Sequence, residues 1–132
     1  MFRLTVETEF AAAHAIVMRG EREPIHGHNW KVTACVVGHT LDDDGLLCDF
    51  HAVEASLRKA TERFHNRNLN EIPPFDRTNP TAELVAKHLA EAIAGSIPAA
   101  DASRGVRVEW VRVTEAPGCS ATYCVPWPDS QR

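Results

Sequence analysis

The chain has 132 residues, of which 44% are hydrophobic and 24% charged, and its formal net charge is -4. This length suits one domain over residues 1–132 with a single two-layer core, and the composition is ordinary for a soluble globular protein. The acidic balance without a run of lysine or arginine argues against a nucleic-acid partner, and no apolar stretch approaches the ~20 residues that span a membrane.

Alternating polarity predicts two strands in the first third of the chain. Residues 2–13 alternate between apolar and polar side chains, and they lack the apolar core of a signal peptide. A second alternation over residues 30–36 predicts another strand, and the aspartates at 42–44 predict a turn.

Two helices are predicted next. From about Phe50 the apolar spacing becomes helical. The first apolar stripe consists of Val53, Leu57, Ala60 and Phe64. The second helix is predicted to start at Asn79-Pro80, with the asparagine as its cap and the proline in its first position, and to end at Gly95.

Residues 106–113 and 121–125 return to strand character, separated by a turn at Pro117-Gly118. The order strand, strand, helix, helix, strand, strand predicts an α+β fold: a four-stranded antiparallel sheet with both helices on one face. The uncovered face and the sheet edges need protection, so we expect assembly with copies of the same chain. The number of copies is left open.

The four cysteines show no C-x-x-C spacing, which disfavours both a disulfide framework and a structural zinc site. We therefore expect reduced thiols in a cytoplasmic protein.

The segment His26-Gly27-His28 is the strongest chemical motif. Residues i and i+2 of a strand point the same way, so both imidazoles can reach one ion, with no side chain between them. His14 would complete a three-histidine set with an open position, as in catalytic zinc sites, only if the first strand pairs beside the second. His39 and His88 have no partner at ligand spacing.

Several charged residues have two interpretations. Glu115 ends a strand and is either a functional carboxylate or a solvated strand end; Glu21 and Glu23 lie in a polar loop and need no function beyond solubility. His65 and Arg67 follow the first helix, where they could simply complement the helix dipole.

Five segments together resemble the 6-pyruvoyltetrahydropterin synthase and 6-carboxytetrahydropterin synthase family, in the family's order and across nearly the whole chain. The segments are Phe10-Ala11-Ala12-Ala13-His14, His26-Gly27-His28-Asn29-Trp30, Gly45-Leu46-Leu47-Cys48-Asp49-Phe50, Asn79-Pro80-Thr81-Ala82-Glu83 and Val111-Arg112-Val113-Thr114-Glu115.

The resemblance implies a tunnelling fold, in which trimers or stacked trimers close their sheets into a barrel with active sites between subunits. It implies zinc on His14, His26 and His28 and a pterin ring held by Glu115. It further implies substrate contacts from Thr81, Glu83 and Arg67. Relatives act as zinc-dependent lyases on dihydroneopterin triphosphate, releasing triphosphate or acetaldehyde.

The proton-transfer residues depart from the family pattern. The position of the usual catalytic cysteine holds Arg22, and the Asp-His pair after the first helix is replaced by His65-Asn66. Neither a guanidinium nor an amide can act as a general base, so we expect His65 and Glu23 to substitute.

Three functions remain open at this stage. The first is a zinc lyase of the pterin or deazapurine (queuosine) pathways with altered proton-transfer groups. The second is the same fold redirected to a non-pterin ring in specialised metabolism. The third is a non-catalytic module that binds zinc and a pterin.

Overall fold

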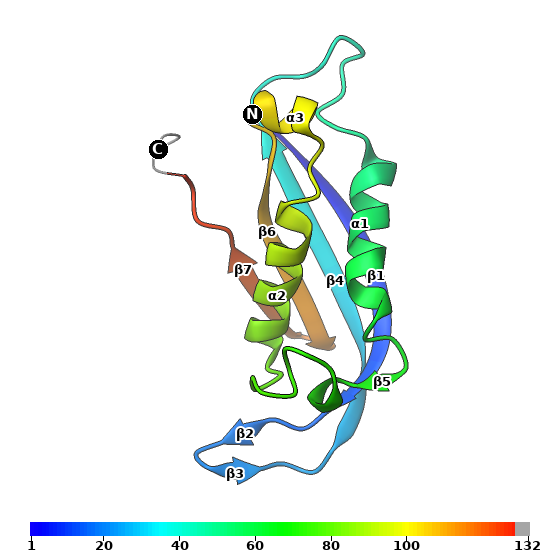
Figure 1. Cartoon of the computed structure of the whole chain (residues 1–132), viewed down its shortest axis with the longest axis vertical. Coiled ribbons are helices and arrows are strands. Elements are labelled where there is room, and N and C mark those ends of the chain that lie inside the picture. The colour runs from blue at the N-terminus through cyan, green and yellow to red at the C-terminus, as the bar shows by residue number, and fades with distance from the viewer. Residues whose placement is uncertain (129–132) are drawn as a thin grey trace.

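The computed structural model describes residues 1–128, and its centre is a sheet with the strand order β5-β1-β4-β6-β7 (Figure 1). The four long strands are β1 (Phe2–His14), β4 (His26–Gly38), β6 (Arg107–Ala116) and β7 (Cys119–Cys124). They pair antiparallel throughout, which confirms the predicted four-stranded arrangement. The two-residue β5 (Arg67–Asn68) joins β1 in parallel and is an addition too short to leave a pattern in the sequence.

Helices α1 (Phe50–Glu62) and α2 (Ala82–Ala94) cover the same face of the sheet, as predicted (Figure 1). Helix α1 begins where expected because the Asp49 carboxylate accepts a hydrogen bond from the His51 backbone N–H. A short α3 (Ala99–Ser103) precedes β6 and was not predicted.

The predicted start of α2 at Asn79-Pro80 is wrong by two residues. Thr81 is the cap, and its hydroxyl accepts from the Leu84 backbone N–H at 3.2 Å. The Asn79 side chain is engaged elsewhere: it accepts from the Val17 backbone N–H and donates to the Val17 carbonyl, both at 2.9 Å. Asn79 is favoured as the cap by local preference, but its side chain is hydrogen-bonded to the Val17 backbone and is therefore not available to cap the helix.

The segment between β1 and β4, expected to be a polar loop, forms a hairpin of β2 (Val17–Met18) and β3 (Glu21–Arg22) at one end of the molecule (Figure 1). Arg19 and Gly20 both have positive φ at its tip, the conformation of a tight hairpin turn. A 3-10 turn, η1 (Leu69–Glu71), follows β5 at the same end.

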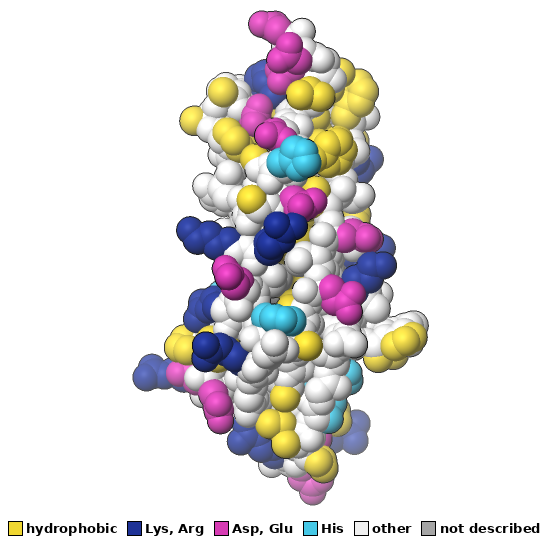
Figure 2. Space-filling view, turned by 90° about the vertical axis from the view of Figure 1, so that its right-hand side faces the viewer, with side chains coloured by type: hydrophobic (Ala, Val, Ile, Leu, Met, Phe, Trp, Pro, Cys, Tyr) yellow, Lys and Arg dark blue, Asp and Glu magenta, His cyan; other side chains and the backbone are white. Residues whose placement is uncertain are grey.

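The core lies between the sheet and the two helices. Phe10, Trp30 and Phe64 are among its largest fully buried side chains, and the Phe10 and Trp30 rings stack with centroids 5.8 Å apart. On the face seen in Figure 2, acidic and basic side chains are interspersed. Between residues 1 and 128, no helix is long and apolar enough to cross a membrane.

Candidate metal centre

The pairing of β1 with β4 places three histidines at one end of the core. His14 and His26 are direct partners in the antiparallel register, which meets the condition on which the third ligand depended. Side chains alternate along a strand, so His28 lies on the same face as His26. His14 is 1% exposed, whereas the other two imidazoles are partly open to solvent.

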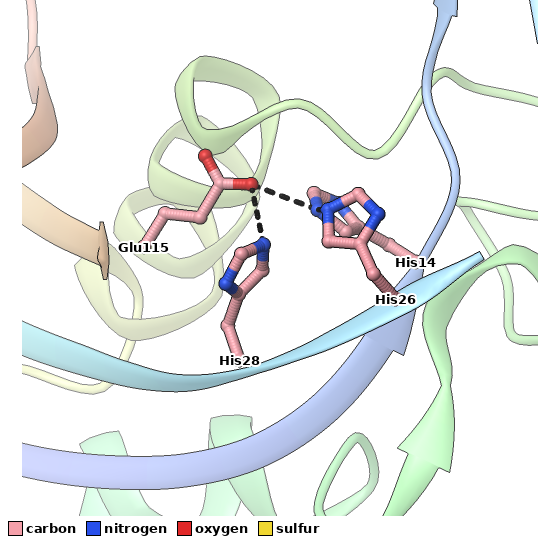
Figure 3. Close-up of side chains that lie close together, drawn as sticks. All are labelled: His14, His26, His28 and Glu115. Atoms are coloured by element: carbon pink, nitrogen blue, oxygen red, sulfur yellow. Dashed lines mark hydrogen bonds and ion pairs between the residues drawn. The ribbon is translucent and has the colours of Figure 1, made fainter. Parts of the chain in front are cut away.

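The imidazoles converge through their Nε2 atoms, and the carboxylate of Glu115 joins them from β6 (Figure 3). The His14 and His26 Nε2 atoms are 3.1 Å apart, and Glu115 Oε1 lies 2.8 Å from His14 Nε2 and 3.1 Å from His28 Nε2. All four potential ligand atoms lie within 4.8 Å of one another. Ligand atoms around a tetrahedral zinc are about 3.3 Å apart for bonds of roughly 2.0–2.1 Å, so these distances suit such an ion.

Backbone carbonyls determine which nitrogen is free in two of the three imidazoles. His14 Nδ1 donates to the Pro80 carbonyl and His26 Nδ1 donates to the Pro24 carbonyl, each at 2.9 Å. In the neutral rings the Nε2 atoms then carry lone pairs, which repel one another at 3.1 Å unless a cation or a proton lies between them. Within residues 1–128, the buried His28 Nε2 also has no aligned hydrogen-bond partner.

The electrostatic environment favours neutral His28, the form that binds a metal. Burial is the largest cause of a lowered pKa at this imidazole; Glu115 acts against it, and the neighbouring His14 lowers the pKa again. The donor set, its spacing and its orientation by carbonyls all fit a divalent metal such as zinc.

Two further side chains, Trp30 and Asn70, position this cluster, and the sequence assigned neither of them a role in the site. Trp30 Nε1 donates to the Ala12 carbonyl at 3.1 Å, and the Trp30 ring lies edge-on to His14 with centroids 4.8 Å apart. Asn70 accepts from the Ala15 N–H and donates to the Ala15 carbonyl, both at 2.8 Å, and so holds the residue after His14. The sequence signal for Asn70 is the pair Leu69-Asn70, which matches a Leu-Asn pair that follows the first helix in the family pattern.

Comparisons with known proteins identify the family of this chain. The family model described as "6-pyruvoyl tetrahydropterin synthase" matches residues 3–125. The chain belongs to this family. A protein of Archaeoglobus fulgidus named "Putative 6-carboxy-5,6,7,8-tetrahydropterin synthase" is 27% identical over 110 residues, which cover 83% of this chain and 84% of that protein.

Solved 6-pyruvoyl tetrahydropterin synthases share the fold. The Caenorhabditis elegans structure has a TM-score of 0.78 at 20% identity, covering 96% of this chain and 98% of that one. The Plasmodium vivax structure has a TM-score of 0.75 at 20% identity, covering 92% and 96%. The family's tunnelling fold is therefore the fold of this chain.

Of the predicted proton-transfer residues, the structure places one beside the cluster. Glu23 Oε1 lies 3.7 Å from His26 Nε2 and accepts from the Ile16 backbone N–H at 3.0 Å. His65 lies elsewhere, in a hollow between α1 and β1, where its Nδ1 accepts from the Ala11 N–H at 3.1 Å. Among the described residues, no contact links His65 to the cluster of its own chain.

The predicted substrate-binding residues are also dispersed. Arg67 lines an open groove of about 570 Å³ that His28 also borders. Thr81 caps α2, and the exposed Glu83 lies in the first turn of that helix, where its charge suits the helix dipole. Glu115 lies among the histidines, with Oε1 beside His14 and His28.

The two other departures from the family pattern have local structural surroundings. Arg22 is exposed on β3 and borders a small hollow that Glu23 also lines. Asn66 adopts a positive φ of 59°, and its backbone N–H donates to the Ala11 carbonyl at 2.6 Å. Asparagine tolerates this left-handed conformation better than most residues, so the substitution agrees with the local backbone.

Proposed function

We propose that the protein is a zinc-dependent lyase of the 6-pyruvoyl- or 6-carboxytetrahydropterin synthase type, acting on a dihydroneopterin triphosphate-like substrate. The observation that carries this proposal is the convergence of His14, His26 and His28 through their Nε2 atoms, with two rings oriented by backbone carbonyls. When bound, zinc would supply Lewis-acid polarisation of the substrate's side-chain oxygens.

Glu115 is the proposed anchor of the pterin ring. A carboxylate can accept two parallel hydrogen bonds, from the ring's exocyclic amino group and from the adjacent ring N–H. Because Glu115 lies beside His28, a ring held by Glu115 would direct the side chain of the pterin toward the three histidines.

Glu23 is the best-placed proton acceptor of this chain. Its carboxylate lies beside His26, and the Ile16 N–H orients it. Solved variants of the Plasmodium vivax protein replace a glutamate that is named as its catalytic residue, so a carboxylate serves catalysis in at least one relative. Arg67, in the groove beside His28, is the proposed partner of the substrate's phosphates.

The homo-oligomer, trimer or hexamer, remains part of this proposal, and so does a single domain over residues 1–132. His65 lies between α1 and β1, where it cannot transfer a proton at the histidine cluster of its own chain. A role in proton transfer therefore requires that it act on the site of a neighbouring copy.

The metal assignment is tested by elemental analysis of the wild type and of His14→Ala, His26→Ala and His28→Ala. We expect one zinc per wild-type chain and strongly reduced occupancy in each variant, because two imidazoles bind far more weakly than three. His39→Ala, outside the cluster, is the matched control. Full occupancy after loss of His26 or His28 would refute the assignment.

Turnover is tested by incubating the zinc-loaded protein with dihydroneopterin triphosphate, with and without acetaldehyde trapping, and reading products by mass spectrometry. General acid–base groups typically contribute ~10²–10⁴ in rate, so we expect weak activity in the wild type. The restoring triple change Arg22→Cys, His65→Asp and Asn66→His should raise it. No product from either protein would favour a redirected or non-catalytic site.

A further inference from the structure

Glu115 occupies the place of a fourth metal ligand. Its Oε1 lies within 3.1 Å of two of the three Nε2 atoms, while Figure 3 shows its other oxygen directed away from the imidazoles. A register shift between Thr114 and Ala116 interrupts the pairing of β6 with β7 at this residue, and such a bulge redirects a side chain. Three imidazoles and one carboxylate oxygen would complete a tetrahedral shell without an open position.

The cluster and a pterin ring compete for the same carboxylate. Recognition of two parallel N–H donors uses both oxygens of a carboxylate. Oε1 lies 2.8 Å from His14 Nε2 and 3.1 Å from His28 Nε2, and these imidazoles crowd the approach of a ring N–H, so the two-point contact favours a Glu115 that has left them. The Glu115 side chain is 27% exposed, which leaves it accessible to a ligand that approaches from solvent.

We propose that Glu115 closes the metal site as its fourth ligand until a ring with two adjacent N–H donors draws it away. Ring recognition and the opening of a coordination position are then one event. A molecule that carries the correct side-chain oxygens on a wrong ring leaves the metal closed. This inference rests on the proposed function, because it takes the three histidines as metal ligands and Glu115 as the ring anchor.

Displacement of Glu115 from the metal by a ring would couple ring binding to anion binding, and this coupling can be measured. A small anion that binds at the open position should bind weakly to the protein without a ring and more tightly once a ring is bound. By reciprocity, the anion must tighten ring binding by the same factor, and coupling factors are typically about 5–150-fold.

The test uses the full chain loaded with Co²⁺, whose visible absorption reports the number and kind of its ligands. Azide, a small anionic probe, is titrated into the wild type, Glu115→Ala and Glu115→Gln. Glu23→Gln is the matched control, because it removes the other carboxylate near the cluster. Each titration is repeated with unsubstituted pterin, which has the ring and no side-chain hydroxyl to compete for the metal, and with glycerol, which has hydroxyl groups and no ring.

We expect azide to bind at least about 10-fold more tightly to Glu115→Ala than to the wild type or to Glu23→Gln, a difference within the usual range of such coupling. Pterin should raise the azide affinity of the wild type to that of Glu115→Ala, and glycerol should not. Circular dichroism identifies a misfolded variant, and the comparison of wild type with and without pterin requires no variant at all.

The outcomes separate the two proposals. Cobalt bound by the histidines, with equal azide affinity in the wild type and Glu115→Ala, would overturn the fourth-ligand role and leave the zinc assignment intact. An effect of Glu115→Ala without an effect of pterin would overturn the coupled opening. Failure of the wild type to bind cobalt would overturn both proposals.

Discussion

At the scale of residues, the contacts of Glu115 could not be predicted from its position in the chain. It ends a strand almost 90 positions after His28, and yet the two side chains are 3.1 Å apart. In the proposed ring contact, Glu115 would accept two charge-assisted hydrogen bonds, which are stronger than neutral ones and are both affected when the charge is removed.

Glu115→Gln should therefore weaken the binding of neopterin by about 2–3 kcal/mol, or roughly 30- to 150-fold in Kd. The amide keeps the shape of the side chain and loses the charge and half of the acceptor capacity. Isothermal titration of both proteins measures the difference. Glu91→Gln, at an exposed carboxylate on α2, should bind as the wild type does; equal affinity for all three proteins would mean that no ring contacts Glu115.

His88 is a titratable residue outside the site that links stability to pH. It lies half-buried between the rings of Phe64 and Phe75, with centroids 5.6 and 5.5 Å away, and burial, followed by the charge of Arg63, lowers its pKa. The unfolded chain then binds the proton more readily than the folded chain. The contribution of neutral His88 is complete above the unfolded pKa of about 6.5 and is lost as the pH falls below that value.

His88→Gln should therefore lose less stability than the wild type between pH 7.5 and pH 5.5. Thermal unfolding of the metal-free proteins at both pH values measures this. His51→Gln, at an exposed histidine, is the control and should retain the wild-type pH dependence. An unchanged dependence in His88→Gln would show that other groups carry the effect.

At the scale of elements, the residues at the start of α2 contribute both to the stability of the helix and to the orientation of His14. Thr81 caps the helix, and the preceding residue, Pro80, supplies the carbonyl that orients His14. The cap hydroxyl is engaged with the Leu84 N–H, so a structural role competes with the substrate contact that the family resemblance implies.

Thr81→Ala should lower the free energy of unfolding by about 1 kcal/mol, the usual cost of a lost cap, and Thr81→Ser should restore most of it. Urea denaturation followed by circular dichroism measures both. Wild-type stability in Thr81→Ala, combined with weaker neopterin binding, would instead favour the substrate role.

At the scale of the whole molecule, the separation of His65 from the histidine cluster of its own chain makes assembly testable. If a site combines His28 of one copy with His65 of another, mixing a variant that lacks His28 with a variant that lacks His65 should restore some intact sites. When His65→Ala and His28→Ala chains are mixed in equal amounts after unfolding and refolding together, about a quarter of the interfaces combine both intact residues in a heterologous ring.

We expect each variant alone to be inactive and the refolded mixture to regain about a quarter of the wild-type turnover. Native mass spectrometry of the same samples gives the number of copies. Mixtures that assemble and stay inactive, or a His65→Ala protein as active as the wild type, would remove His65 from the proton-transfer set.

Local pattern alone determined much of this protein. Alternation along 2–13, 30–36, 106–113 and 121–125 and helical spacing after Phe50 depend only on which face of an element meets the core. They therefore predicted the four long strands, helices α1 and α2 and the order of these elements. The spacing of His26 and His28 placed two imidazoles on one face for the same reason, and five short segments sufficed to indicate the family.

Tertiary structure alone decided the contacts between distant segments. The β1–β4 register brought His14 opposite His26, the Val17 backbone took Asn79 away from the α2 cap, and the end of β6 carried Glu115 into the cluster. Such contacts depend on how elements close on one another in space. The periodicity of one element does not predict such contacts, because the two partners come together only when the sheet has formed.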